Sequence, residues 1–353
     1  MPPSANPTAD APQRGAAEGV SREIRLVGHP TGLSGEGLFE VVESPIPDPA
    51  EGQLLIRNAY FSVDPYMRPR TGDVRAYVAP FTVGDALTGV GVGRVAVSRN
   101  PRFAEGDWVL HTLGWREWAL SDGTHVWNVD PTVAPVSTAL GVLGPPGFTA
   151  YFGLHQIGRP QAGETVFVSG ASGAVGSAAG QMARIAGCRV IGSAGSPGKV
   201  AWLRDLGFDE VFDYHARPVR EALADAAPGG IDVYFDNVGG DHLEAAIASM
   251  RNHGRIVACG CMSRYAESEP AVPRNLFMVV TKRLHMEGFR ITEHLDRFPE
   301  FLAKAREWVR DGRLRHRESV IDGIENAPSA FLGLLRGESI GKVLVKVGPA
   351  DDE

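Results

Sequence analysis

Two glycines in the middle of the chain have the type and spacing of a dinucleotide-binding loop. The stretch VSGASGAVG, residues 168–176, fits the pattern A-x-G-x-x-G, with Ala171 in place of the usual first glycine. Gly173 would let the backbone approach a pyrophosphate, and Gly176 would let the following helix pack against the strand. Amide groups at the helix start would then bind the phosphates. The residues predicted to form this loop are Ala171, Ser172, Gly173, Ala174, Val175 and Gly176.

The stretch VIGSAGSPGK, residues 190–199, indicates which dinucleotide binds. NAD sites usually have an acidic residue at the end of the second strand, because a carboxylate accepts hydrogen bonds from the ribose hydroxyls. Here that place holds small residues, and Lys199 follows in the first turn of a predicted helix. A merely solvated lysine there would interact unfavourably with the helix dipole, whereas a lysine beside a 2′-phosphate would be well placed. The sequence therefore predicts NADPH.

The chain around these residues alternates between apolar runs and amphipathic segments. Six apolar runs follow one another from about residue 164: ETVFVS, CRVIGSA, EVFDY, IDVYFD, RIVACG and LHMEGF. Such alternation is typical of an α/β protein with a doubly wound parallel sheet. Ser196 and Pro197 predict a helix with an N-cap serine and a first-turn proline, ending near Gly207.

A second, mostly β domain is predicted from the remaining sequence. Short β-type runs broken by Gly and Pro occur from about residue 22 onwards, and GKVLVKV near the carboxyl end returns to this pattern. We therefore expect four parts. They are a disordered tail at 1–21, a mostly β domain at 22–140, a doubly wound α/β domain at 141–312, and a return to the first domain at 313–353.

Composition argues against several classes of partner. The formal net charge of -7 and the lack of a dense Lys/Arg block argue against nucleic acid. The longest weakly polar runs fall far short of the roughly 20 apolar residues that span a bilayer. The amino terminus lacks the apolar core of a signal peptide, and three cysteines in apolar segments suit a reduced protein. We expect a cytoplasmic protein that binds neither nucleic acid nor membrane.

The sequence contains no local metal-binding motif. Its ten histidines form neither H-x-x-H nor H-E-x-x-H, and no C-x-x-C pair occurs. Without a metal, hydride transfer to a simple ketone is difficult, because an alkoxide must be stabilised. A conjugated C=C bond accepts hydride at its β-carbon, and the charge moves to an enolate oxygen that needs only a modest donor, such as a tyrosine hydroxyl. The residues favour metal-free reduction of an α,β-unsaturated carbonyl compound.

Several motifs together resemble the zinc-independent medium-chain dehydrogenase/reductases. This group contains leukotriene B4 12-hydroxydehydrogenase/prostaglandin reductases, alkenal double-bond reductases and NADPH-dependent curcumin reductase. The matching stretches are SVDPYMR (62–68), PPGFTAYFGL (145–154), GSPGK (195–199), YFDNVGG (234–240), CGCMSRY (259–265), MEGF (286–289) and the run from 325 to 347. The resemblance implies a GroES-like catalytic domain beside the Rossmann domain, a homodimer, NADPH, and reduction of enones or alkenals.

The resemblance also implies roles for residues outside the glycine loop. Tyr265 and Tyr66 would face the substrate, with Tyr265 as the hydrogen-bond donor to its carbonyl. Lys199 and Tyr214 would hold the 2′-phosphate end of the cofactor. The remaining cofactor-binding residues would be Asn237, Cys259, Gly260, Tyr265, Phe289, Arg290 and Ser339.

These roles have alternatives, and the sequence departs from the family in places. Tyr214 would otherwise cap a strand, and Tyr66 would otherwise pack into the first domain. The family usually has Asn where Ser339 stands, and a serine is shorter and lacks the amide. Arg264 precedes Tyr265, which raises the hypothesis of a preference for acidic or polar substrates. Two other functions stay open: an NADPH:quinone reductase, and a non-catalytic NADPH-binding protein.

Overall fold

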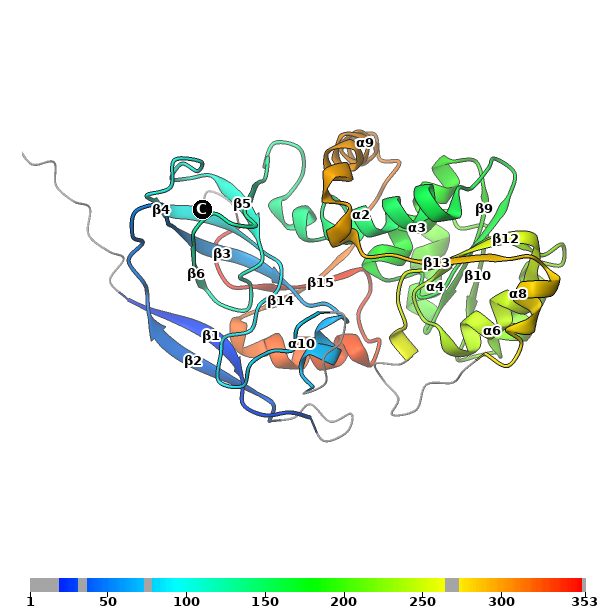
Figure 1. Ribbon diagram of the computed structural model, residues 1–353, viewed down its shortest axis with the longest axis horizontal. Helices are drawn as coiled ribbons and strands as arrows, with labels where there is room; N and C mark the ends of the chain where they lie inside the picture. The colour runs from blue at the N-terminus through cyan, green and yellow to red at the C-terminus, as the bar shows by residue number, and fades with distance from the viewer. Residues whose placement is uncertain (1–18, 31–36, 73–77, 264–272, 351–353) are drawn as a thin grey trace, which may run out of the picture.

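The computed structural model describes residues 19–30, 37–72, 78–263 and 273–350. These residues form two lobes (Figure 1), one of them mostly β and the other α/β. The amino-terminal tail predicted as disordered lies almost wholly outside the described residues. The carboxyl-terminal strands and α10 (Ala327–Leu335) lie with the amino-terminal lobe (Figure 1).

A six-stranded parallel sheet forms the centre of the α/β lobe. Its strand order is β10-β9-β8-β11-β12-β13, and every neighbouring pair is parallel. The prediction of six βα units in a doubly wound sheet is therefore confirmed, since the chain starts in the middle of the sheet and extends it to both sides. The strands are β8 (Thr165–Val168), β9 (Arg189–Ala194), β10 (Glu210–Asp213), β11 (Ile231–Asp236), β12 (Met250–Ala258) and β13 (His285–Gly288).

Helices cover both faces of this sheet. One apolar cluster joins its strands to α2, α3, α4 and α9, and a second joins them to α5, α6 and α8. Burial on both faces explains why the strands are apolar throughout rather than alternating. The helices are α2 (Pro145–Phe152), α3 (Ala174–Ile185), α4 (Pro197–Asp205), α5 (Val219–Ala226), α6 (Gly240–Ser249), α8 (Phe277–Thr281) and α9 (Phe298–Arg310). The chain also forms a π-helix, η2 (Gly153–Gly158), and short 3-10 helices η1 (Val136–Leu140), η3 (Ile291–Glu293), η4 (Leu295–Arg297) and η5 (Ile324–Asn326).

The other lobe contains a sheet with the strand order β14-β15-β3-β4-β5-β7, with β6 also pairing β3. Strand β15 lies between β14 and β3, so residues from both ends of the chain share this sheet. Trp115, Phe61 and Phe331 form part of the core, and Trp115 is 1% exposed. The strands of this sheet are β3 (Leu54–Ser62), β4 (Gly91–Ser98), β5 (Trp108–His111), β6 (Trp118–Ser121), β7 (Trp127–Asn128), β14 (Glu318–Asp322) and β15 (Lys342–Lys346). Strands β1 (Val20–Leu26) and β2 (Phe39–Pro45) form a separate two-stranded antiparallel sheet. The lobe also contains the short helix α1 (Met67–Arg70).

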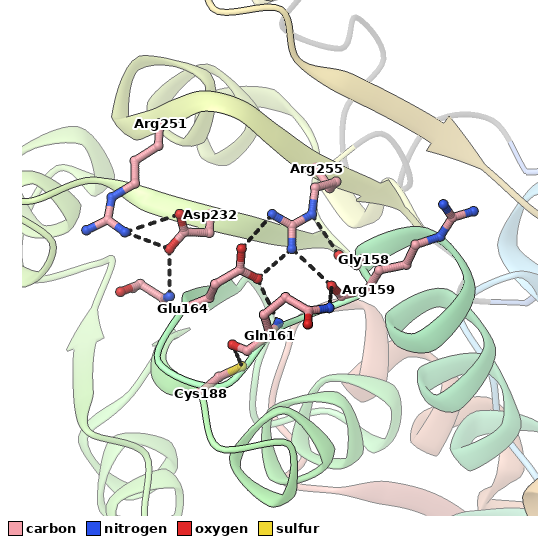
Figure 2. A network of polar contacts seen from close by, with 9 residues as sticks. Gly158, Arg159, Gln161, Glu164, Cys188, Asp232, Arg251 and Arg255 are labelled. Carbon is pink, nitrogen blue, oxygen red and sulfur yellow. Dashed lines mark hydrogen bonds and ion pairs between the residues drawn. The ribbon is translucent and has the colours of Figure 1, made fainter.

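Ion pairs fix the amino-terminal ends of the parallel strands (Figure 2). The Arg255 guanidinium donates two hydrogen bonds to the Glu164 carboxylate, at 2.5 and 3.0 Å. Arg251 pairs with Asp232 at 2.9 Å, and Asp232 also accepts from the Thr165 amide. Bidentate geometry makes such pairs strong, and they lie at the end of the sheet opposite the ligand-binding end.

The two lobes meet along the segment that follows α9. The Gln181 side chain on α3 donates to the Arg315 carbonyl at 2.9 Å and accepts from the Arg315 amide at 2.8 Å. Gly341, at the start of β15, donates its amide to the Ser172 carbonyl of the glycine loop at 2.8 Å. These contacts attach the carboxyl-terminal segment to the α/β lobe, and its strand β15 pairs with β3 in the other lobe. The domain limits at 140, 312 and 353 stay a prediction.

Candidate functional site

The glycine loop connects β8 to α3 at the carboxyl end of the sheet. Gly170 has a φ of +56°, the left-handed conformation that favours glycine, so it forms the turn one residue before Ala171. A Cβ on Gly176 would lie 2.5 Å from the Gly170 oxygen, which explains why a glycine is needed there. A Cβ on Gly173 would meet only that oxygen, at 3.5 Å, and otherwise point into open space. Gly173 therefore leaves room for a ligand, whereas Gly176 serves packing.

The other loop residues hold the turn in place. Ala171 is fully buried, and its amide donates to the Ser193 carbonyl on the neighbouring strand at 3.0 Å. Ser172 is buried and accepts from Gly341. Ala174 and Val175 lie in the first turn of α3 and are partly exposed. The first-turn amide groups thus lie at the open side of the loop, where an anion would be stabilised.

Lys199 lies in the first turn of α4, next to the end of β9. Ser196 is the N-cap, and its hydroxyl accepts from the Lys199 amide at 3.4 Å, as the sequence predicts. The Lys199 side chain is 8% exposed, so it is not a solvated lysine. Its ammonium donates to the Gly337 carbonyl, and burial lowers its pKa. A buried cation whose acceptor is a neutral carbonyl is a good partner for a phosphate dianion.

Tyr214 borders the same corner of the site. A Cβ on Gly195 would lie 2.6 Å from the Tyr214 hydroxyl oxygen, so only a glycine lets this ring approach. Burial, and then the charge of Asp213, raises the Tyr214 pKa. The Tyr214 ring therefore lies against the 195–199 segment, which ends at Lys199. Ser339 is partly buried, in the segment whose Gly337 carbonyl accepts from Lys199.

Two residues near this corner have polar atoms without a partner among the described residues. The Ser193 hydroxyl is fully buried at the end of β9, and the His242 Nε2 is buried beside the Tyr214 ring. Unpaired buried polar atoms are costly, so they indicate where a ligand would add hydrogen bonds. Neither residue was predicted to contact the cofactor. Ser193 lies in the 190–199 stretch discussed above, and no sequence signal marked His242.

A buried carboxylate organises the turn after β11. The Asp236 Oδ1 accepts from the Tyr234 hydroxyl at 2.7 Å and from the Gly239 amide at 2.8 Å. Asn237 donates its side-chain amide to the Ser169 carbonyl at 2.8 Å, which ties this turn to the glycine loop. Burial raises the Asp236 pKa. Asp236 and Ser169 were not predicted, although an acid after a buried apolar run was a visible signal.

Cys259 and Gly260 follow β12 at the same end of the sheet. Both of their amides donate to the Asp236 carbonyl, each at 3.0 Å. Burial raises the pKa of the Cys259 thiol to about 12, so this thiol stays protonated. Cys188, Cys259 and Cys261 are all free. The main-chain amides of Cys259 and Gly260, rather than the Cys259 thiol, therefore hold this segment against the turn that contains Asn237.

Phe289 and Arg290 follow β13, the last strand of the sheet. The Phe289 ring packs against Phe152, with centroids 5.4 Å apart, and a Cβ on Gly153 would lie 2.8 Å from it. Arg290 is exposed and pairs with Glu293. Phe289 thus forms a wall at the carboxyl end of the strands. Arg290 points its charge toward a neighbouring carboxylate.

Tyr66 comes from the other lobe, at the N-terminal boundary of α1. Its partly buried ring packs against the core that contains Trp115. Burial and the charge of Asp64 raise the Tyr66 pKa well above its usual value, so its hydroxyl is protonated at neutral pH. The predicted residues Tyr265 and Arg264 lie outside the described residues.

Two kinds of feature are absent from the described part of the chain. Within it, no group of three or more His, Cys, Asp or Glu side chains is arranged to hold a metal ion. No helix within it is long and apolar enough to cross a membrane.

Two family models match the chain. Residues 22–129 match the N-terminal domain of oxidoreductase, and residues 174–307 match the family described as zinc-binding dehydrogenase. The second match begins at α3 and ends within α9, so it includes every strand of the parallel sheet except β8. Despite the name of that family, the described residues contain no metal-binding cluster.

Individual relatives match over nearly the whole chain. The NADPH-dependent curcumin reductase of Escherichia coli is 39% identical, over 94% of this chain and 98% of its own. The NADP(+)-dependent 2-alkenal reductase of Nicotiana tabacum is also 39% identical, over 94% of this chain and 99% of its own. The structure of CurA from Vibrio vulnificus in complex with NADPH has a TM-score of 0.88 and 40% identity, covering 93% of this chain and 99% of that one.

Proposed function

The chain belongs to the zinc-independent medium-chain dehydrogenase/reductase family, and from this premise we propose that it is an NADPH-dependent reductase of the C=C bond of α,β-unsaturated ketones or aldehydes. The observation that carries the proposal is the 39% identity, over nearly the full length, to a curcumin reductase and to a 2-alkenal reductase. The substrate would be of the curcumin, 15-oxo-prostaglandin or 2-alkenal type.

The residues at the carboxyl end of the sheet fit NADPH. Gly173 leaves open space beside the first-turn amides of α3, and the Ser193 hydroxyl is buried without a partner among the described residues. We assign the pyrophosphate to the 171–176 loop and the 2′-phosphate to Lys199 and Tyr214. Asn237, Cys259, Gly260, Phe289, Arg290 and Ser339 complete the proposed set.

When bound, NADPH supplies the hydride that adds to the β-carbon of the enone. The tyrosines of the chain act on the other end of the substrate. A hydroxyl of Tyr265, assisted by Tyr66, would donate a hydrogen bond to the carbonyl oxygen, where negative charge develops as the enolate forms. Tyrosine hydroxyls are protonated at neutral pH, and the raised pKa of Tyr66 keeps it a donor in alkaline solution as well. Solvent or a bound water would then protonate the α-carbon.

A consumption assay tests the proposal. NADPH oxidation should occur with enones and 2-alkenals, and Tyr265→Phe should lower kcat about tenfold or more, because one positioned donor is worth at least that. Lack of turnover across a varied panel of enones would contradict the proposal. Turnover of quinones alone would favour a quinone reductase, and tight NADPH binding without turnover would favour a non-catalytic binding protein.

We also propose that the protein is a cytoplasmic homodimer. Strand β13 is the edge of the parallel sheet, and Met286 on it is 43% exposed. Phe277 and Val280 on the nearby α8 are 74% and 67% exposed. An unpaired edge beside large exposed apolar side chains is typical of a surface that a second copy covers. The three free cysteines support a reducing compartment.

A further inference from the structure

One short segment of the carboxyl-terminal region contacts the cofactor-binding residues at two places. At its start, the Gly337 carbonyl accepts from the Lys199 ammonium. Near its end, the Gly341 amide donates to the Ser172 carbonyl at 2.8 Å, and Gly341 forms a parallel bridge with Gly173. The 337–342 segment therefore runs from the proposed 2′-phosphate end to the glycine loop.

The last residue of this segment, Lys342, is a buried cation. Its side chain is 5% exposed, and its ammonium donates to the Val63 carbonyl at 2.9 Å, to the Asp64 Oδ1 at 3.0 Å and to the Val343 carbonyl at 3.0 Å. All three ammonium hydrogens thus have acceptors. The Asp64 carboxylate also accepts from the Ser62 hydroxyl. Lys342 therefore fixes both the main chain and the side chain of the turn at 63–64.

This turn leads directly into Tyr66. The Met67 amide donates to the Asp64 carbonyl at 3.1 Å, and the Arg68 amide donates to the Pro65 carbonyl at 3.0 Å, so residues 64–68 form one compact turn. A displacement of Asp64 would therefore displace Tyr66. Lys342 is next to Gly341, which is bonded to the glycine loop, so two adjacent residues join the loop to the Tyr66 turn.

We propose that Lys342 is a positioning residue that holds the Tyr66 turn in register with the glycine loop. This inference rests on the reductase function proposed above. Lys342 would act through Asp64 and Tyr66 and would touch neither cofactor nor substrate. Misplacing a reacting group by about 1 Å can reduce a rate about 100-fold, so a tether at this point affects catalysis more than it affects binding.

A charge-neutral double variant separates positioning from folding. In Lys342→Met/Asp64→Asn no unpaired buried charge remains, but the Val63 and Val343 carbonyls lose a donor, so we expect a folded protein with a lower Tm. At a temperature well below that Tm, we expect kcat for an enone to fall at least tenfold, with KM for NADPH within twofold of the wild type. A wild-type kcat in this variant would overturn the proposal.

A second ion pair, in the parallel sheet of the other lobe, provides the control. Arg255 and Glu164 also form a partly buried ion pair, and they lie at the amino-terminal strand ends, away from the site (Figure 2). Arg255→Met/Glu164→Gln should leave kcat unchanged, even if it lowers the Tm. An equal fall in kcat in both double variants would mean that loss of any such pair slows the enzyme, and would overturn the specific role of Lys342.

Hydrogen exchange provides a readout that does not need turnover. In the wild type, NADPH should slow amide exchange in residues 62–68, because ordering the glycine loop also orders the turn joined to it through Gly341 and Lys342. Lys342→Met/Asp64→Asn should bind NADPH with a Kd within twofold of the wild type but without this protection. Equal protection in both proteins would overturn the proposal. If the wild type reduces no enone, the proposed function fails, and the exchange result alone decides the role of Lys342.

A milder variant serves if the double variant does not fold. Ser62→Ala removes one donor to Asp64 and leaves the Lys342–Asp64 ion pair in place, so this variant should fold. We expect it to lower kcat about threefold with an unchanged KM for NADPH. A kcat equal to the wild type would count against a role for this network.

Discussion

At the residue scale, we propose that the preference for NADPH depends on the buried ammonium of Lys199. The ammonium of this residue lies in a site where water is largely excluded, and its present acceptor is a neutral carbonyl. An ionic hydrogen bond in such surroundings is worth about 1.5–3 kcal/mol. NADH has no 2′-phosphate, so it cannot use this contact.

Replacing Lys199 should therefore affect the two coenzymes differently. Lys199→Ala should raise KM for NADPH about 10- to 100-fold and leave KM for NADH nearly unchanged, as measured by initial rates with one enone. Arg204→Ala is the matched control, because Arg204 is an exposed cation on the same helix. Equal effects of Lys199→Ala on both coenzymes would mean that this ammonium does not set the preference for NADPH.

At the element scale, we assign different roles to two glycines of the loop: packing to Gly176 and ligand approach to Gly173. Gly176 faces the backbone of residues 170–171, whereas Gly173 faces open space. The A-x-G-x-x-G pattern predicts both roles: the contacts of Gly176 agree with the packing role, and the pyrophosphate role of Gly173 stays a prediction. The pattern did not show that Gly170, rather than Ala171, makes the turn. Both residues are small, and a positive φ is a property of the folded backbone that the sequence does not display.

Alanine substitutions should separate the two roles. Gly176→Ala places a Cβ within 2.8 Å of two backbone atoms, so we expect a Tm several degrees lower. Gly173→Ala should keep the Tm of the wild type but weaken NADPH binding about tenfold or more, because its methyl group would occupy the space left for the pyrophosphate. Calorimetric titration and thermal melts measure both effects. Normal NADPH affinity in Gly173→Ala would contradict the assignment of the loop.

At the scale of the whole molecule, the sequence predicts contacts within each βα unit better than contacts between distant segments. The six strands were visible as apolar runs, and Ser196 and Pro197 marked the start of α4. The acceptor of Lys199 lies 138 residues away at Gly337, and the partner of Lys342 lies 278 residues away at Asp64. No local pattern encodes such pairs, since they arise only when both lobes have folded.

The assembly prediction belongs to this scale as well. Phe277→Glu/Val280→Glu should convert a homodimer into a monomer, because two carboxylates would have to be buried in an apolar interface. Light scattering coupled to gel filtration measures the mass. Lys304→Glu on α9 places a similar charge change elsewhere on the surface and should leave the mass unchanged. A wild-type protein of 37.7 kDa would contradict the dimer itself.

The central place of β15 has a consequence for biosynthesis. The parallel sheet uses residues 165–288 in one continuous stretch, so it has all its strands while translation continues. The sheet of the other lobe lacks an inner strand until residues 342–346 have left the ribosome, although most of its strands are made first. The amino-terminal lobe therefore completes its sheet only after all strands of the nucleotide-binding lobe have been synthesised. Until then its early strands have unpaired edges, which chaperones would need to protect.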